Sequence, residues 1–159
     1  MKVFIRRDTS DIHSRFLVFD EFENKIYTVS GRNTDSGELM MVMDGGFTAA
    51  KIRDLKLPVI DAYSVTVAQE CVKLIFSYRA GRLRARYSGI SWRIRGDILC
   101  GSYDILDTDG TIICSVFEHF SKNCTELNIF EKSRELFCIA SAICVNSLNV
   151  ERVPDFQLT

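Results

Sequence analysis

The segment ELFCIASAICVNSL, which runs from Glu135 to Leu148, decides the fold predicted for this chain. Its apolar side chains leave almost no polar side until Asn146, and a helix that is apolar all round has to be surrounded by protein. Ser133 is expected to cap its start, and Glu135 falls in the first turn, where the helix dipole favours an acid. We therefore predict a hydrophobic C-terminal helix over residues 134–148, enclosed in the core.

The same segment is too short to cross a membrane. From Leu136 to Leu148 it falls well below the ~20 residues that span a bilayer. The N-terminal sequence MKVFIRRD becomes charged before its apolar stretch reaches the ~7 residues that a secretory signal needs. The six cysteines are widely spaced and form no C-x-x-C pair, which indicates free thiols in a reducing compartment. We expect no signal peptide, no transmembrane segment and a cytoplasmic protein.

Alternation of apolar and polar residues dominates the chain before this helix. It is clear in Tyr63–Val67 and in Arg82–Tyr87, and it is typical of half-buried antiparallel strands. Turns rich in Asp and Gly, such as Asp107–Gly110, join these strands into hairpins. A helix of ~15 residues is about as long as a strand of seven, so it fits inside a barrel. We predict one domain over residues 1–159, mainly β with one core helix (α+β), in which a closed antiparallel β-barrel encloses the helix.

Several short motifs, in a fixed order, resemble the LURP-one-related family, which shares its fold with the tubby C-terminal domain and the phospholipid scramblases. The motifs are FLVFD at Phe16–Asp20, GELMMVMDG at Gly37–Gly45, WRIRG at Trp92–Gly96, YDILD at Tyr103–Asp107, and the apolar helix. The resemblance implies a barrel of about twelve strands wrapped around a central C-terminal helix. It also implies phosphoinositides as a ligand class, because tubby-like domains bind them.

Basic residues are concentrated in one part of the chain. Residues 71–96 contain seven basic residues and no acidic one, although the whole chain has a net charge of −1. Five of the arginines lie on two consecutive predicted strands, and on each strand they share one face. Arg82, Arg84 and Arg86 are on the first strand, and Arg93 and Arg95 are on the second. If these strands pair, five guanidinium groups form one external patch, and their planar forks suit phosphate oxygens. We predict a site for anionic head groups or phosphates, with peripheral contact to a membrane; an ordinary solvated outer face is the alternative.

Nucleic acid is disfavoured as a partner. The isoelectric point is near 6.1, and Tyr87 and Trp92 alternate with the arginines, so they point inward, away from a nucleic-acid strand on the arginine face. A protein partner is the competing hypothesis: an interaction module or oligomeric structural module that uses a sheet edge or an apolar patch and binds no small ligand. Scramblase-like lipid transport lacks a segment of membrane-spanning length.

Other chemistry finds little support in the sequence. Asp107–Gly110 followed by Glu118 has the wrong spacing for a calcium loop. His13 and His119 stand apart from any cluster of cysteines, so no metal site is expected, and a nucleophile pair of His119 with Cys124 has no motif around it. Phosphate-loop, dinucleotide and nucleophile-elbow motifs are missing from the sequence. We expect a non-enzymatic binding or scaffold domain with no catalytic residue, metal or cofactor.

Overall fold

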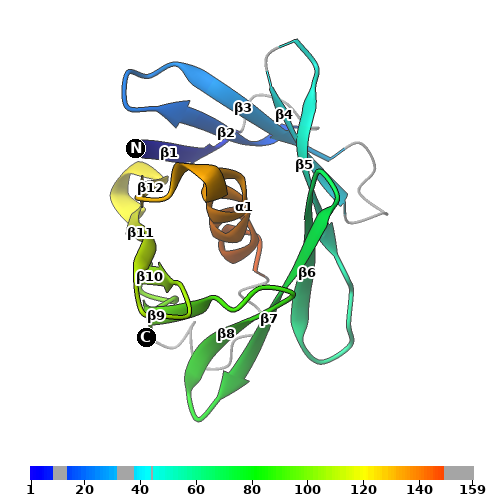
Figure 1. Cartoon of the computed structure of the whole chain (residues 1–159), viewed down its shortest axis with the longest axis vertical. Helices are drawn as coiled ribbons and strands as arrows, with labels where there is room; N and C mark the ends of the chain where they lie inside the picture. Colours follow the sequence, from blue (N-terminus) through cyan, green and yellow to red (C-terminus); the bar gives the residue numbers. More distant parts are fainter. Residues whose placement is uncertain (9–13, 32–37, 44, 149–159) are drawn as a thin grey trace.

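A computed structural model describes residues 1–8, 14–31, 38–43 and 45–148, which form one twelve-stranded antiparallel sheet and one α-helix (Figure 1). The strands are β1 (Lys2–Arg7), β2 (Ser14–Asp20), β3 (Lys25–Ser30), β4 (Glu38–Met43), β5 (Thr48–Asp54), β6 (Asp61–Val67), β7 (Glu70–Arg79), β8 (Arg82–Ser88), β9 (Arg93–Asp97), β10 (Ser102–Leu106), β11 (Ile112–His119) and β12 (Cys124–Ile129). The α-helix α1 spans Glu135–Asn146, and the short 3-10 helices are η1 (Phe120–Lys122) and η2 (Lys132–Arg134). His13, Gly37 and Asp44, named above, lie outside the described residues.

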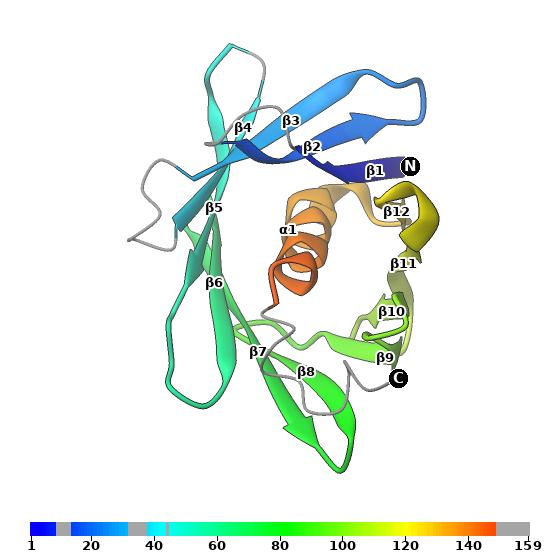
Figure 2. The same cartoon turned by 180° about the vertical axis from the view of Figure 1, so that it is seen from behind.

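Pairing of the first and last strands joins the runs β1 to β8 and β9 to β12 into one sheet, which curls into a barrel (Figure 1). β1 lies antiparallel to β12, with Lys2 opposite Asn128, and the strand order runs from β8 through β1 and β12 to β9. The predicted barrel with a core helix is confirmed, and it is nearly closed. β8 and β9 are the two edges of the sheet; they lie beside each other (Figure 2), but no ladder of hydrogen bonds joins these two described strands.

Side chains fill the junction between β8 and β9 in place of backbone hydrogen bonds. Trp92, which precedes β9, is 6% exposed. Its ring packs edge-to-face against Tyr87 on β8 and Phe137 on α1, with centroids 5.6 and 6.3 Å apart. Such pairs add to the stabilisation from burial alone. The bulky indole therefore holds β9 against β8 and the helix without continuing the sheet.

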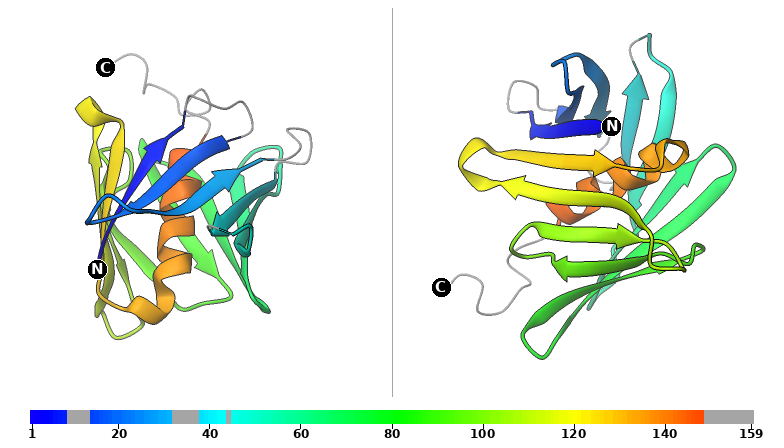
Figure 3. Two further views of the ribbon diagram at one scale, coloured as in Figure 1. Left: turned by 90° about the horizontal axis from the view of Figure 1, so that it is seen from above. Right: turned by 60° about the vertical axis from the view of Figure 1, so that its left-hand side comes forward.

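The helix runs along the inside of the curled sheet, as the left view of Figure 3 shows. All eight residues of the range 137–144 are buried, so the enclosed helix predicted from the sequence is confirmed. Its ends differ from the prediction. Arg134 occupies the N-cap position, whereas Ser133 lies in η2 and its hydroxyl donates to Glu131 at 3.4 Å. The helix ends at Asn146, two residues early. No helix among the described residues has the length and apolar character to cross a membrane.

The helix defines two ends of the barrel. At its start, the Tyr27 hydroxyl on β3 donates to Glu135 at 3.2 Å. At its other end, the Arg7 guanidinium on β1 donates to the carbonyl of Asn146 at 3.0 Å. We call these the helix-start end and the helix-finish end of the barrel.

All six cysteines are free thiols, in agreement with the sequence. Cys114, Cys124, Cys138 and Cys144 are buried in or against the core, where a thiol behaves as a small apolar side chain. The other two, Cys71 and Cys100, are exposed.

Candidate functional site

The arginines predicted on one face of a strand lie on the outer face of β8. Arg82, Arg84 and Arg86 are exposed, while the residues between them face the core side. Tyr87, at the end of the same alternation, is 8% exposed and points to the helix. The period of two in the sequence therefore gives the correct side for each arginine.

Strand pairing brings four further basic residues onto this outer face. Arg79 lies opposite Arg82 across the β7–β8 pair, and Lys73 is on the same side of β7. Continuing through β6, Ser64 lies between Lys73 and Arg53, and Thr66 lies opposite Lys51. We call the resulting set the basic face: Lys51, Arg53, Lys73, Arg79, Arg82, Arg84 and Arg86, all of them exposed.

The acidic residues of β5 to β8 fall on the other side of the sheet. Asp54 lies opposite Tyr63, and Asp61 lies opposite Phe76, both of which are buried. Glu70 accepts an ion pair from Arg134 at 3.0 Å, at the helix-start end. In the described strands β5 to β8, the outer face therefore carries basic residues and no acidic one. Glu38, opposite Arg53, is the first acid beyond it on β4.

The two remaining predicted arginines lie on β9, across the unpaired junction. Arg93 and Arg95 are both exposed. Arg95 forms an ion pair with Asp104 at 3.0 Å. Although partial burial opposes ionisation of Asp104, hydrogen bonds from Ser115 and Arg95 lower its pKa. The five predicted arginines thus occupy the two neighbouring edges of the barrel and do not share one hydrogen-bonded pair of strands.

Arg82 and Asp97 connect these two edges electrostatically. The thiol and amide of Cys100 donate hydrogen bonds to Asp97, and Arg82 attracts its charge, so the pKa of Asp97 lies below its usual range. Arg82 and Arg95 each have an acid nearby, whereas Arg84, Arg86 and Arg93 form no ion pair within the described part of the chain.

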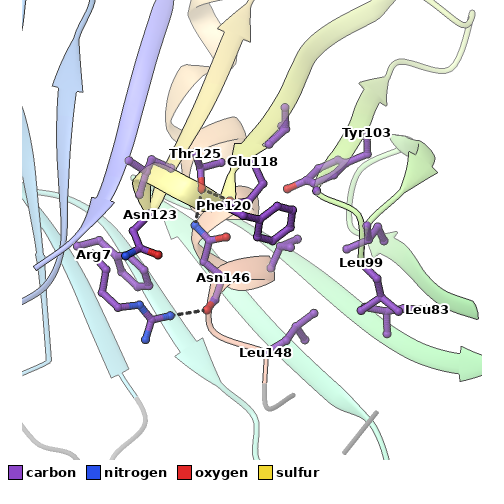
Figure 4. Close-up of a pocket in the computed structure, with 16 residues that line it drawn as sticks. Arg7, Leu83, Leu99, Tyr103, Glu118, Phe120, Asn123, Thr125, Asn146 and Leu148 are labelled. Carbon is purple, nitrogen blue, oxygen red and sulfur yellow. Dashed lines mark hydrogen bonds between the residues drawn. The ribbon is translucent and has the colours of Figure 1, made fainter. Parts of the chain in front are cut away.

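A cavity of about 240 Å³ lies at the helix-finish end of the barrel (Figure 4). Leu83 on β8 and Leu99, in the turn after β9, both line it. The cavity therefore forms where the barrel is not closed by hydrogen bonds. Its polar lining includes Tyr103 and Glu118 from the barrel wall and Asn146 from the end of α1.

Comparison with known proteins fits this architecture. The sequence profile of the LURP-one-related family matches residues 1–146, which include the whole barrel and the helix. The chain belongs to the LURP-one-related family. An X-ray structure of the Arabidopsis thaliana protein AT5G01750 is similar to this LURP-one-related domain, with a TM-score of 0.60 over 91% of each chain. At 11% identity that likeness shows the fold alone. No curated protein matches the sequence.

The aspartates of the turn after β10 serve the turn itself. The Asp107 carboxylate accepts from the Thr108 amide at 2.7 Å, and the Asp109 carboxylate accepts from the Thr111 amide at 2.9 Å. This is the local bonding that makes Asp frequent in turns. Throughout the described residues of this LURP-one-related domain, no group of three or more His, Cys, Asp or Glu side chains is arranged to hold a metal ion.

His119 and Cys124 lie opposite each other on β11 and β12. The histidine ring, however, meets Glu126 at 3.1 Å, and Cys124 is buried; among the described side chains, no hydrogen bond joins the ring and the thiol. The register thus brings the two residues together without forming a nucleophile and base pair.

Sequence reasoning missed part of the basic face and the whole cavity. Lys51 and Arg53 alternate with the buried Ile52, which is a signal for two outward basic residues, but only the strand register places them beside β7. For the cavity, the available signal is Asn146, a polar residue at the end of an apolar helix. Its partners come from strands far away in the chain.

Proposed function

We propose that this LURP-one-related domain is a non-enzymatic cytoplasmic binding domain that holds the phosphate groups of anionic head groups on its basic face. Arg82, Arg84 and Arg86 form the centre of the proposed site, and Arg93 and Arg95 flank it across the β8–β9 junction. One observation supports the proposal: seven exposed basic side chains share an outer face of β5 to β8 that carries no acid among the described residues. A solvated face that served only solubility would be expected to mix both signs of charge.

Hydroxyl groups accompany the basic side chains on this face. Ser77 lies opposite Arg84, and Ser64 lies opposite Lys73. A guanidinium group binds a phosphate with two parallel hydrogen bonds, and a neighbouring hydroxyl supplies a further donor. The shared chemistry is a phosphate group, which a lipid head group and a free inositol phosphate both provide.

The expected binding is reversible and sensitive to salt. A basic residue near an anionic membrane contributes ~1 kcal/mol, so the basic face contributes up to roughly 7 kcal/mol at low ionic strength. Exposed charges are screened over a Debye length of about 8 Å at physiological salt. The domain would therefore bind reversibly to a membrane surface without inserting into the bilayer.

Co-sedimentation with liposomes at low salt tests the proposal. Phosphatidylcholine vesicles are compared with the same vesicles containing a phosphoinositide, and soluble inositol hexakisphosphate serves as competitor. We expect the protein to pellet with the phosphoinositide vesicles only. The triple variant Arg82→Glu, Arg84→Glu, Arg86→Glu should lose at least about a hundredfold in binding, because it removes at least three contributions of ~1 kcal/mol.

A matched control carries the same change in net charge elsewhere. Lys25→Glu, Lys122→Glu and Lys132→Glu alter three exposed lysines that lie outside the basic face. This control should pellet with anionic vesicles far better than the arginine variant. Equal binding of the wild type and the arginine variant to the phosphoinositide vesicles would contradict the proposal. Binding to soluble inositol hexakisphosphate without binding to vesicles would identify a free phosphate as the ligand.

A second candidate function, a protein-interaction or oligomeric module, is favoured by apolar side chains at the helix-start end. Phe22, Phe47 and Phe130 are 77%, 75% and 66% exposed, in the turns after β2 and β4 and just after β12. Exposed aromatic groups of this kind are typical of contact surfaces. Size-exclusion mass at several concentrations tests the oligomeric form of this function. A mass that rises with concentration, and falls in Phe22→Ser, Phe47→Ser, Phe130→Ser, supports self-association, while a constant monomer mass excludes self-association.

A further inference from the structure

The cavity at the helix-finish end contains a buried hydroxyl group without a partner. Tyr103 is 4% exposed, and its hydroxyl points into the cavity (Figure 4). No described residue donates to or accepts from this hydroxyl. A buried polar group left unpaired costs about 1 to 3 kcal/mol. Burial, and after it the neighbouring ionisable groups, with Tyr87 the largest of them and Glu118 the smallest, hold the pKa of Tyr103 well above its ordinary value. The phenol is therefore a neutral hydrogen-bond donor directed at whatever occupies the cavity.

A second polar group in the same cavity is held ready as an acceptor. The Asn146 side-chain amide donates to Thr125 Oγ1 at 3.0 Å, and the Thr125 hydroxyl donates to Glu118 Oε2. The Glu118 amide also donates to the carbonyl of Gly101 at 2.7 Å. This chain of bonds fixes the Glu118 carboxylate and leaves its second oxygen without a bond from these residues.

Gly101 makes this arrangement possible. Its φ is +73°, and a Cβ at this position would collide with Cβ of Glu118. A glycine here lets the turn after β9 approach β11 closely, which brings Glu118 to the cavity between the turn and the helix.

The remainder of the lining is mostly apolar. Its aliphatic members include Leu83, Ile98, Leu99, Val116, Val145 and Leu148. An ordered water needs two to four polar partners, so water alone suits the tyrosine corner and not this apolar part. The volume of about 240 Å³ is slightly smaller than typical small-ligand pockets of roughly 300 Å³ or more. A ligand smaller than a drug-sized molecule suits it.

The charges of the lining point to an uncharged ligand. Glu118 repels a carboxylate or phosphate, and Arg7, an exposed residue of the same lining, repels a cation. An alcohol satisfies both polar groups at once, because its oxygen accepts from Tyr103 and its proton is donated to Glu118. We propose that the helix-finish cavity binds a small amphipathic alcohol, with the hydroxyl between Tyr103 and Glu118 and the hydrocarbon chain against the aliphatic lining.

Isothermal titration with octanol, octanoate and octylamine tests this proposal. We expect octanol to bind with one-to-one stoichiometry, and octanoate and octylamine to bind at least about tenfold more weakly. Tyr103→Phe should weaken octanol binding about tenfold, because it loses one buried hydrogen bond. Without ligand, the same variant should be no less stable than the wild type, since the hydroxyl that it removes has no partner in the chain.

The controls separate this site from the rest of the molecule. Tyr27→Phe removes a hydroxyl at the helix-start end and should leave octanol binding unchanged. Leu99→Trp fills the cavity and should abolish binding; Leu83→Trp serves the same purpose if Leu99→Trp does not fold. The variant Arg82→Glu, Arg84→Glu, Arg86→Glu should bind octanol like the wild type. The octanol test therefore does not depend on whether the basic face binds phosphate groups. Failure of octanol to bind, or equal binding of octanol and octanoate, overturns the proposal, as does binding that Tyr103→Phe leaves intact.

Discussion

The hydroxyl of Tyr87, on the edge strand β8, donates a hydrogen bond of 2.8 Å to Oγ of Ser141 in the middle of α1. Ser141 in turn donates to the carbonyl of Phe137 at 2.7 Å. Both side chains are buried, so this bond joins the barrel wall to the helix inside the core. It also explains a serine among the buried residues of the helix, since the hydroxyl both accepts and donates a hydrogen bond.

Ser141→Ala should destabilise the domain by about 1 to 3 kcal/mol, because it leaves the buried Tyr87 hydroxyl unpaired. Tyr87→Phe combined with Ser141→Ala should cost less than the sum of the single changes, since the double variant leaves no orphaned group. Denaturant unfolding of the four proteins in this cycle measures both quantities. A strictly additive double variant would show that the bond contributes nothing to stability.

Ile139→Asp should prevent folding. Ile139 is fully buried on the helix inside the barrel, and an unpaired carboxylate there costs several kcal/mol, against a net stability of ~5 to 15 kcal/mol for a whole domain. Ile139→Val, which keeps the apolar character, should cost only about 0.5 to 1.5 kcal/mol. Solubility on expression and the melting temperature provide the measurement. Soluble Ile139→Asp with an unchanged melting temperature would contradict an enclosed helix.

The sequence predicted this core well because its signals are local. Alternation in segments such as Arg82–Tyr87 identifies the outward side of a strand, and the absence of a polar side on 135–145 identifies an enclosed helix. The missing hydrogen bonds between β8 and β9 could not be predicted in this way. They depend on how Trp92 packs against Tyr87 and Phe137, which is a relationship between three distant parts of the chain.

The candidate sites were predictable to different degrees for the same reason. Arg82, Arg84 and Arg86 share one strand, so their common face follows from spacing. Lys51 joins them only through the register of β5 on β6 and of β6 on β7. Tyr103 stands in a strand like any other core tyrosine, and its unpaired hydroxyl becomes visible only when the end of α1 is placed beside it.

Gly101→Ala should destabilise the domain more than Gly110→Ala does. Both glycines have positive φ, +73° and +86°, so alanine is strained at each. A Cβ on residue 101 also collides with Glu118, whereas nothing lies within 4 Å of a Cβ on residue 110. The difference in the free energy of unfolding between the two variants therefore isolates the collision, and we expect it to exceed about 1 kcal/mol. Equal destabilisation would mean that the turn after β9 moves away without cost.

Stability should fall at alkaline pH, in part through Tyr27. Burial, followed by the charge of Glu135 and the hydrogen bond to it, raises the pKa of Tyr27 from 10.0 to about 12. Because the folded protein holds this proton more tightly than the unfolded chain, the contribution is fully present below pH ~10 and is lost as the pH rises through ~12. The free energy of unfolding measured across this window should decline less steeply in Tyr27→Phe. An identical slope in both proteins would place the alkaline loss in other tyrosines.

Removing a single charge from the basic face should stabilise the domain at low salt. Arg84 has exposed basic neighbours on the same face and no ion pair within the described residues, so its charge is repelled. Arg95 differs, because it pairs with Asp104 at 3.0 Å. We expect Arg84→Gln to raise the melting temperature by about 1 °C at low salt, and Arg95→Gln to leave it unchanged or lower it slightly. Both effects should shrink in 1 M salt, where the Debye length is about 3 Å. A lower melting temperature for Arg84→Gln would mean that this arginine stabilises the barrel. Its presence on the face would then be explained without a ligand.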